Sequence, residues 1–415
     1  MAIANYDLGE WSIAADQVEQ ALQLISPNNP LLAQLHNTKA SLLLAAGNPQ
    51  QALDQWQRSE QLYGQLGDLQ GEIGAKLNQA QSLQAMGFFR QSQQTLDQIY
   101  AHVPGDAEPS LKIKLLESLG STYQLTGNLV RGEELLQEAL AIATQEQQTE
   151  IQSSILFNLA NNYRAQEDPD NALRYYDQAA QLTQNNLLRL EAQVNQLGLR
   201  KSQQNWQEVQ ALEALIQPQL RDVNLNPSRR GVYAQINLAQ SLIEINEEKL
   251  ALHYEPLEIA QLLAQAINNA KNLSDNKLES YGLGTLGYLY EQNQQWQEAE
   301  QVTMQALTLA EAMKARDISY QWQWQLGRIY QAQGNIQQAI DSFTLAVNTL
   351  QILRTDLVAI NSDVRFSFRE KVEPVYRGLV SLLLTPSDSN NQLPSKTTTQ
   401  NKPRFPRIGP FPKAI

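Results

Sequence analysis

The sequence repeats itself with a period of about 40 residues. A frame of leucine, a small residue, two variable residues and tyrosine occurs as LGSTY from position 119, LANNY from 159, LGYLY from 286 and LGRIY from 326. The small residue of the frame, called the anchor below, has eight copies: Ala40, Ala80, Gly120, Ala160, Gly198, Ala239, Gly287 and Gly327. Successive anchors are 40, 40, 40, 38, 41, 48 and 40 residues apart. Such a period indicates one supersecondary unit that is copied along the chain and buries its apolar face against its neighbours.

Each unit has the pattern of two helices joined by a tight turn. A second small residue usually lies twelve positions after the anchor, at Ala52, Ser92, Gly132, Ala172, Ala299 and Ala339, and a third lies seven further on, as at Ala139, Ala179, Ala306 and Ala346. Glycine and asparagine mark the turn between the first two sites, for example at Gly127-Asn128 and Gly334-Asn335. The spacing of small residues predicts paired helices at close approach, and therefore an all-α fold.

These positions resemble the tetratricopeptide repeat family. The best match is Leu326, Gly327, Tyr330, Ala339, Phe343 and Ala346. The resemblance implies a right-handed α-solenoid of stacked helical hairpins over residues 1–353, with a partial first copy and about eight repeats. The period of about 40 exceeds the family's usual 34. We expect the extra six residues after the second small site, in the second helix, the next turn or the start of the next first helix.

Two repeats are irregular. In the fifth, Val209 replaces the second small residue, and Pro218 and Pro227 follow as helix breakers. The sixth carries an insertion around the sequence EEKLALHYEP, which ends at Pro256. We expect a bend or a protruding loop between Pro218 and Pro256.

The first helices are expected to line a concave groove that binds a protein or peptide. The family pattern places groove positions at Asn161, Arg164, Tyr233, Gln240, Tyr281, Tyr288, Trp324 and Arg328, and also at Lys114, Glu117, Ser121, Gln124, Phe157, Asn195, Glu291 and Gln331. Aromatic, arginine and amide side chains are typical of such surfaces. The family's clamp for a C-terminal carboxylate is not expected, because Asn158 and Asn161 lack the matching lysines.

Composition excludes several other functions. The chain has no cysteine, and its three histidines lie in different repeats, so we expect no thiol nucleophile, metal site or cofactor. A net charge of -12 disfavours nucleic acid and anionic membrane surfaces. Without a run long enough to span a membrane or an N-terminal signal pattern, we expect a cytoplasmic chain.

A different pattern begins after residue 353. Residues 364–368 alternate as in an extended segment, and Ser367 with Glu370 fits a capping box. An apolar helical stripe then follows at Val375, Tyr376, Leu379, Leu382 and Leu383, with Pro374 starting or kinking the helix. Residues 354–386 are expected to form a junction, and residues 387–415 a disordered tail.

Residues 353–384 resemble the junction that leads into the caspase-like CHAT domain of bacterial repeat proteins. That resemblance implies a His and Cys pair in a following domain, but neither residue occurs after Leu384, so we expect no peptidase activity. The stripe could fold back on the last repeat, pair with a second copy or receive a protease domain in trans, and we expect an intermolecular contact.

The sequence therefore predicts a protein-binding scaffold, the sensor part of a CHAT-type protein. Two alternatives stay open: a non-catalytic subunit that docks a separately encoded caspase-like protease, and a truncated remnant without function.

Overall fold

The chain forms α-helices throughout the part that the computed structural model describes, which is residues 11–26, 29–45, 48–105, 107–220, 227–247, 254–358 and 373–384. No strand occurs in these ranges. The helices are α2 (Trp11–Leu24), α3 (Leu31–Ala45), α4 (Pro49–Leu66), α5 (Leu69–Ala85), α6 (Phe89–His102), α7 (Pro109–Leu125), α8 (Leu129–Gln145), α9 (Thr149–Ala165), α10 (Pro169–Leu182), α11 (Asn186–Ser202), α12 (Trp206–Ile216), α14 (Arg229–Glu247), α15 (Pro256–Asn272), α16 (Asn276–Gln292), α17 (Trp296–Ala312), α18 (Arg316–Ala332), α19 (Ile336–Val358) and α21 (Glu373–Leu384). The prediction of an all-α fold is confirmed.

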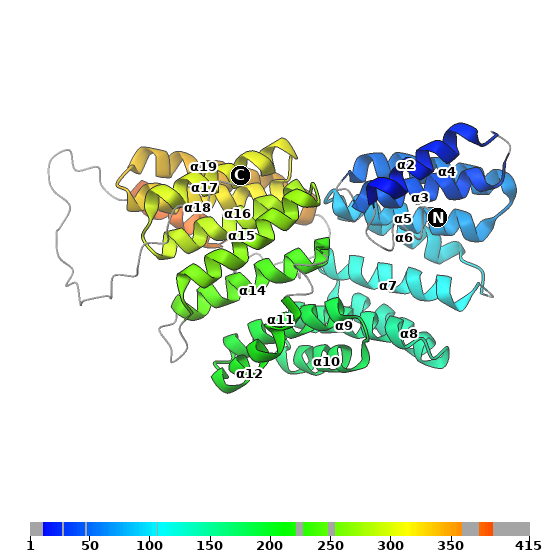
Figure 1. The fold of residues 1–415 in the computed structure, drawn as a ribbon, viewed down its shortest axis with the longest axis horizontal. Coiled ribbons are helices and arrows are strands. Elements are labelled where there is room, and N and C mark those ends of the chain that lie inside the picture. Colours follow the sequence, from blue (N-terminus) through cyan, green and yellow to red (C-terminus); the bar gives the residue numbers. More distant parts are fainter. Residues whose placement is uncertain are drawn as a thin grey trace. The chain divides into compact units, whose positions relative to one another are not determined.

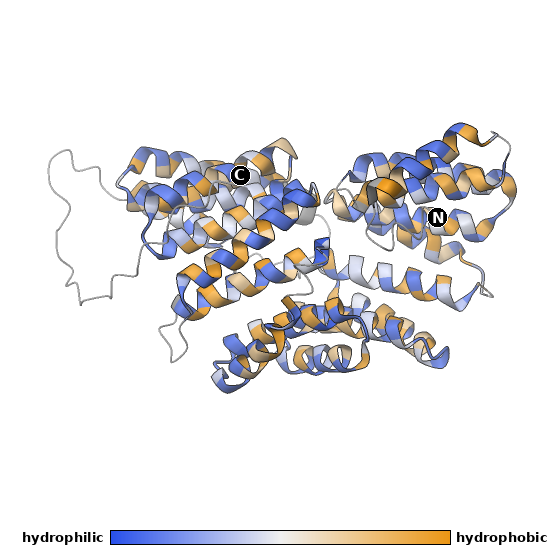
Figure 2. Ribbon diagram, viewed as in Figure 1, coloured by the Kyte–Doolittle hydropathy of each residue, from blue (hydrophilic) through white to orange (hydrophobic). Residues whose placement is uncertain are grey.

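The helices form hairpins that stack on one another, as in an α-solenoid (Figure 1). Contacts divide the chain into two compact units. Unit 1 contains residues 1–234, 269–275 and 355–364, and unit 2 contains residues 235–268, 276–354 and 365–415. Every helix carries both polar and apolar residues, so each one has a face to bury and a face to expose (Figure 2).

Helix length explains the 40-residue period. Helices α7, α8 and α9 have 17 residues each, and three residues separate each from the next. Two such helices and two such turns make one repeat. The turn between repeats is therefore as short as the turn within a repeat, and the residues beyond the usual 34 lie in the helices.

The three-residue turns share one backbone conformation. Their middle residue has positive φ, whether it is glycine, as at Gly127 (86°), or not, as at Glu167 (59°) and Gln294 (59°). The third residue is often Asp or Asn, and its side chain accepts a hydrogen bond from the helix that follows, as Asn128 does from Arg131 N (3.3 Å). The left-handed residue stops one helix and the cap starts the next.

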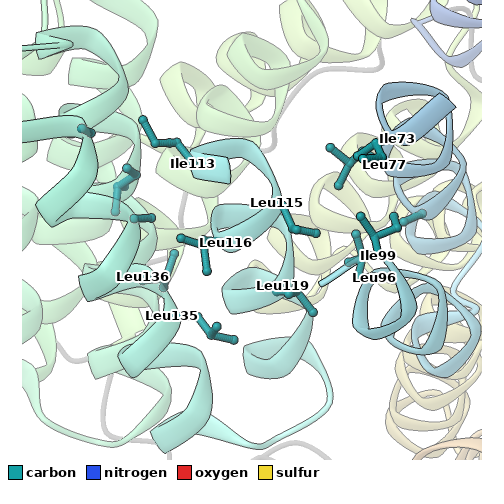
Figure 3. Packing of buried hydrophobic residues seen from close by; sticks show 14 of the residues in the cluster. Ile73, Leu77, Leu96, Ile99, Ile113, Leu115, Leu116, Leu119, Leu135 and Leu136 are labelled. Atoms are coloured by element: carbon teal, nitrogen blue, oxygen red, sulfur yellow. The ribbon is translucent and has the colours of Figure 1, made fainter. Parts of the chain in front are cut away.

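Small anchors let the helices of a hairpin approach closely. A Cβ atom at Gly120 would lie 2.6 Å from Leu136 and 3.0 Å from the carbonyl oxygen of Gly132. Around this contact, apolar side chains of α5 to α9 form one buried cluster, in which Leu115, Leu116 and Leu119 of α7 lie between the side chains of α5 and α6 and those of α8 (Figure 3). In this part of unit 1, neighbouring repeats thus share one core.

The end of the array is covered by α21. Its Val375 and Leu382 are buried against side chains of α18 and α19, among them Phe343 and Val347. Gly378 faces the same Phe343 ring, since a Cβ atom there would lie 2.5 Å from it. A helix in this position shields the apolar face that the last repeat would otherwise expose.

The irregular repeats coincide with gaps in the described ranges. Helix α12 has only 11 residues, and Val209 is fully buried in it. Residues 221–226 and 248–253 lie outside the described residues, so the predicted bend and loop are defined only by their flanks. At the second gap, the Asn246 side chain pairs with the backbone of Tyr254 through two hydrogen bonds, of 2.7 and 2.9 Å, which hold the ends of the insertion together.

The segment predicted as extended, residues 364–368, the capping box of Ser367 and Glu370 and the tail of residues 387–415 also lie outside the described ranges. Within those ranges, no helix is long and apolar enough to cross a membrane.

Candidate protein-binding surfaces

In unit 1, polar side chains link the first helices of neighbouring repeats. Glu117 of α7 accepts hydrogen bonds from Ser154 Oγ (2.7 Å) and Asn158 Nδ2 (2.8 Å) of α9. Burial raises the pKa of Glu117, although these hydrogen bonds and the charges of Arg230 and Lys114 oppose the shift. Asn158, which the family clamp would offer to a ligand, is thus already paired with Glu117.

The two predicted groove residues of α9 have different environments. Asn161 is half-buried and accepts a hydrogen bond from the hydroxyl of Tyr176 in α10. Burial raises the pKa of Tyr176 to about 12, and its ring packs edge-on against Phe157 at 5.5 Å. Arg164 is exposed, and its Nη1 donates to Asn195 Oδ1 of α11 (2.6 Å). Asn161 is therefore held by the core, while Arg164 stays accessible to a ligand.

Further along unit 1, Glu191 of α11 and Arg230 of α14 form an ion pair. Arg230 Nε donates to Glu191 Oε1 (2.9 Å), and Nη2 donates to Oε2. Burial raises the pKa of Glu191, and Arg230 opposes this shift. The family pattern does not mark this pair, because both residues lie nearer the helix N-terminus than the groove positions. An acidic and a basic residue about one repeat apart are the sequence feature from which this ion pair could have been predicted.

In unit 2, aromatic side chains and an ion pair lie on α16 and α18. Arg328 Nε and Nη2 donate to the two carboxylate oxygens of Glu291, at 2.7 and 2.8 Å. The Arg328 guanidinium also lies over the Trp324 ring, 4.3 Å from its centroid. Glu291 is 9% exposed and Arg328 27%, so the pair sits at the border between core and solvent. Arg328 Nη1 is buried and has no hydrogen-bond partner in the part of the chain that is described.

Two tyrosines of α16 extend this surface. Tyr281 packs edge-on against Trp322, with ring centroids 6.1 Å apart, and the Trp322 ring covers Gly284. Tyr288 lies two turns after Tyr281 and is half-buried, as Tyr281 and Trp324 are. Side chains seven positions apart point to the same side of a helix. The aromatic rings therefore have packed inner edges and accessible outer edges.

The eight predicted groove residues do not all belong to one unit. Asn161, Arg164 and Tyr233 lie in unit 1, and Gln240, Tyr281, Tyr288, Trp324 and Arg328 lie in unit 2. The structure places Trp324 directly against Arg328. Gln240 is exposed and donates to Glu244 of its own helix (3.1 Å). A ligand-binding role for these residues stays a prediction.

The predicted docking stripe of α21 is partly buried against the last repeat and partly exposed. Val375 (0% exposed) and Leu382 (6%) are buried against the last repeat, and Tyr376 and Leu379 pack at the edge of the same clusters. The fold-back arrangement therefore applies to these residues, because Phe343 and its apolar neighbours in α19 are close enough to cover them. Leu383 (60%), Val380 (52%) and Leu384 (76%) are exposed and lie outside these two clusters.

A cavity of about 420 Å³ lies between α10, α11 and α12, and none of the eight predicted groove residues lines it. Its lining combines Leu173, Leu212 and Leu215 with the charged residues Asp170, Arg174, Asp177, Arg200 and Glu208. Nothing in the repeat pattern marks this cavity. Over the described ranges, no group of three His, Asp or Glu side chains is arranged to hold a metal ion.

Comparison with known proteins identifies the repeats. Residues 112–185 match one tetratricopeptide repeat model and residues 323–348 match another. These segments are tetratricopeptide repeats. The two segments include the predicted groove residues Asn161, Arg164, Trp324 and Arg328. No curated protein matches the sequence of this chain.

Several solved structures are similar to parts of this chain. A Rap protein complexed with competence and sporulation factor is 13% identical, with a TM-score of 0.49 over 85% of this chain and 86% of its own. BtubC from P. vanneervenii is 16% identical, with a TM-score of 0.34 over 65% of this chain and 91% of its own. Nearly identical TPR-like repeats from Podosopora anserina are 21% identical, with a TM-score of 0.37 over 50% of this chain and 98% of their own.

Proposed function

We propose that this chain is a protein-binding scaffold and that the accessible side chains on the first helices of its tetratricopeptide repeats contact the partner. The observation that carries the proposal is the surface of α16 and α18, where Tyr281, Tyr288, Trp324 and Arg328 are half-buried and Arg328 both stacks on Trp324 and pairs with Glu291. Large aromatic and arginine side chains contribute most of the energy at protein interfaces. Because packing fixes their inner edges, they lose little side-chain entropy on binding.

The surface favours a polypeptide over a small molecule. The rings of Tyr281, Tyr288 and Trp324 are half-buried, so each presents part of its surface to a ligand. An extended segment or a helix could contact several rings at once. The proposal assigns no reaction to the chain.

Capture of partners with the purified chain from a lysate of the source organism tests this function. We expect partners to be lost when Tyr281, Tyr288, Trp324 and Arg328 are all replaced by alanine. Because Arg328→Ala leaves Glu291 buried without its counter-ion, the single variant Tyr288→Ala is measured in parallel and should weaken binding with an unchanged helical circular dichroism spectrum. Exposed Ile336, replaced by alanine, is the control. Partners that survive all four alanines but are lost when residues 248–253 are changed would place binding on the insertion.

A finer form of this proposal gives the chain the sensor role of a CHAT-type protein, or that of a subunit which docks a caspase-like protease in trans. What supports a further partner is the outer side of α21, where Val380, Leu383 and Leu384 are exposed. Replacing Leu383 and Leu384 by serine should abolish association with such a protease, if it is encoded beside this chain, while leaving the fold intact. Equal association of both forms would remove the docking role. If neither experiment captures a partner, the remnant without function is favoured.

A further inference from the structure

The chain is acidic, but it contains one short segment that is basic and rich in proline. Residues 402–413, KPRFPRIGPFPK, hold four prolines, two phenylalanines and four of the chain's 31 Lys and Arg residues, and no acidic residue. The chain as a whole carries a net charge of -12. This stretch, called the Pro-Arg segment below, lies outside the described residues. An isolated basic stretch on an acidic chain is attracted to the remainder of that chain.

Unit 2 offers a surface suited to such a segment. Tyr281 and Tyr288 of α16 and Tyr320 and Trp324 of α18 are all half-buried, and they are called the aromatic face below. Proline-rich segments bind surfaces lined by aromatic rings, because a proline backbone has little conformational freedom to lose. Arginine stacks on such rings, as Arg328 already does on Trp324. Proline, phenylalanine and arginine are thus matched to these half-buried rings, of which Tyr320 and Trp324 also pack against the buried cluster of α19 and α21.

The connection between the two is long enough. The last described residue, Leu384, ends α21, which packs on α18 and α19 within unit 2. Residues 385–401 separate it from the Pro-Arg segment, and a chain of that length spans up to about 55 Å at roughly 3.3 Å per residue. Packed helices lie about 8 to 10 Å apart, so α16 is within about 20 Å of α21. The segment can therefore reach the whole aromatic face of its own chain.

We propose that the Pro-Arg segment of each chain binds the aromatic face of unit 2 in the same molecule and so competes with partners for that surface. Two arguments favour the same molecule over a second copy. A tether of this length gives an effective concentration of about millimolar, and two chains of net charge -12 repel each other. The inference rests on the proposed function, because it names an internal ligand for the same surface.

Distance measurements between two spin labels test the contact. The chain has no cysteine, so two introduced cysteines are labelled without background. Gln331→Cys lies on α18, exposed and one turn beyond Arg328, and Ala414→Cys lies next to the Pro-Arg segment. The doubly labelled full chain should show a narrow population of short distances. Excess synthetic peptide with the sequence of residues 402–413 should abolish it.

Matched variants show which side chains make the contact. Replacing Phe405 and Phe411 by alanine and Arg404 and Arg407 by glutamate should remove the short distances, and Tyr288→Ala should reduce them. Replacing Thr397 and Thr398 by alanine is the control outside the segment and should leave them unchanged. A broad distribution in the unsubstituted chain, or short distances that survive the Phe and Arg substitutions, would overturn the proposal.

Dilution with unlabelled chain separates the two kinds of contact. Short distances that persist on dilution are intramolecular, as expected, and short distances that disappear belong to a second copy and overturn the proposal. The proposed function is judged separately by partner capture. If capture still depends on Tyr288 while the labels show no contact, only the internal ligand is wrong.

Discussion

Phe343 lies between two glycines that belong to different helices. A Cβ atom at Gly327 of α18 would lie 2.7 Å from its ring, and one at Gly378 of α21 would lie 2.5 Å from it. Phe343 is 1% exposed, so it has no free space into which to rotate. The anchor glycine of the last repeat is therefore required by the packing of a single aromatic side chain.

The first prediction follows from this contact. Gly327→Leu should destabilise unit 2 strongly, because overpacking of a filled core costs about 1 to 3 kcal/mol and sometimes more. Gln331→Leu, one turn away and exposed, is the matched control and should change stability little. Thermal unfolding followed by circular dichroism measures both. Equal melting temperatures for the two variants would mean that the repeat register is wrong.

The second prediction concerns Glu117, whose pKa is raised by burial. Its folded pKa lies above its ordinary value of 4.5, so the folded state holds the proton more tightly than the unfolded state. The resulting stability is fully present below about pH 4.5 and is lost as the pH rises through the higher folded value.

Glu117→Gln keeps an oxygen that accepts from Ser154 and Asn158 but carries no charge. We expect this variant to lose that part of the pH dependence and to be at least as stable as the unsubstituted chain at pH 7. Urea unfolding between pH 4 and pH 8 measures the difference. A marked loss of stability at pH 7 would show that Lys114 and Arg230 need the negative charge.

At the scale of elements, the helices end where one residue adopts positive φ. Gly127 and Gly334 do this without strain, whereas Gln147, Glu167, Gln204, Ser274, Gln294 and Lys314 do it with a side chain. The left-handed conformation costs a residue with a side chain about 1 to 2 kcal/mol, and glycine loses about 0.5 to 1 kcal/mol in entropy. The non-glycine turns therefore store a small strain.

The third prediction is that Gln294→Gly stabilises unit 2 by about 0.5 to 1 kcal/mol. The reciprocal variant at the equivalent turn, Gly334→Gln, should destabilise by a similar amount, since its φ is 82°. Both are measured by urea unfolding at neutral pH. A loss of stability in Gln294→Gly would indicate that the glutamine side chain makes a contact that outweighs the strain.

The fourth prediction tests α21 as the cover of the last repeat. Val375→Asp places a charge in a fully buried site beside Val347 and Leu350, and it should release α21 from α19. Val380→Asp makes the same chemical change at an exposed position of the same helix and should be tolerated. Hydrogen exchange in α18 and α19 should rise in the first variant alone. Unchanged exchange in both would show that the last repeat is stable without α21.

At the scale of the whole molecule, stability is distributed between neighbours. The buried residues of the core cluster around Leu119 come from α5 to α9, with Tyr175 of α10 packed against them, and the clusters around Phe343 and Val347 include side chains of α17 to α21. In such arrays, each repeat is stabilised chiefly by the repeats on either side of it. Damage in one unit should therefore stay local.

The fifth prediction makes this measurable. Leu119→Ala opens a cavity in unit 1 and should cost about 2 to 5 kcal/mol of local stability. We expect faster hydrogen exchange in α5 to α9 and unchanged exchange in α16 to α19. A uniform rise in exchange along the chain would instead show that the two units unfold as one.

The 40-residue period determined most of the local structure by itself. Anchor spacing, the glycine and asparagine turns and the buried small residues are all local or nearest-neighbour features, so the helical hairpins and their order could be predicted from sequence. The contacts of α21 could not. Its apolar stripe was compatible with a partner, a second copy or the last repeat, and an intermolecular contact was expected. The packing of Gly378 and Val375 against α19 shows instead that the last repeat covers this part of the stripe. Ion pairs such as Glu191 with Arg230 also depend on the tertiary structure, because the rotation between neighbouring helices decides which charges meet.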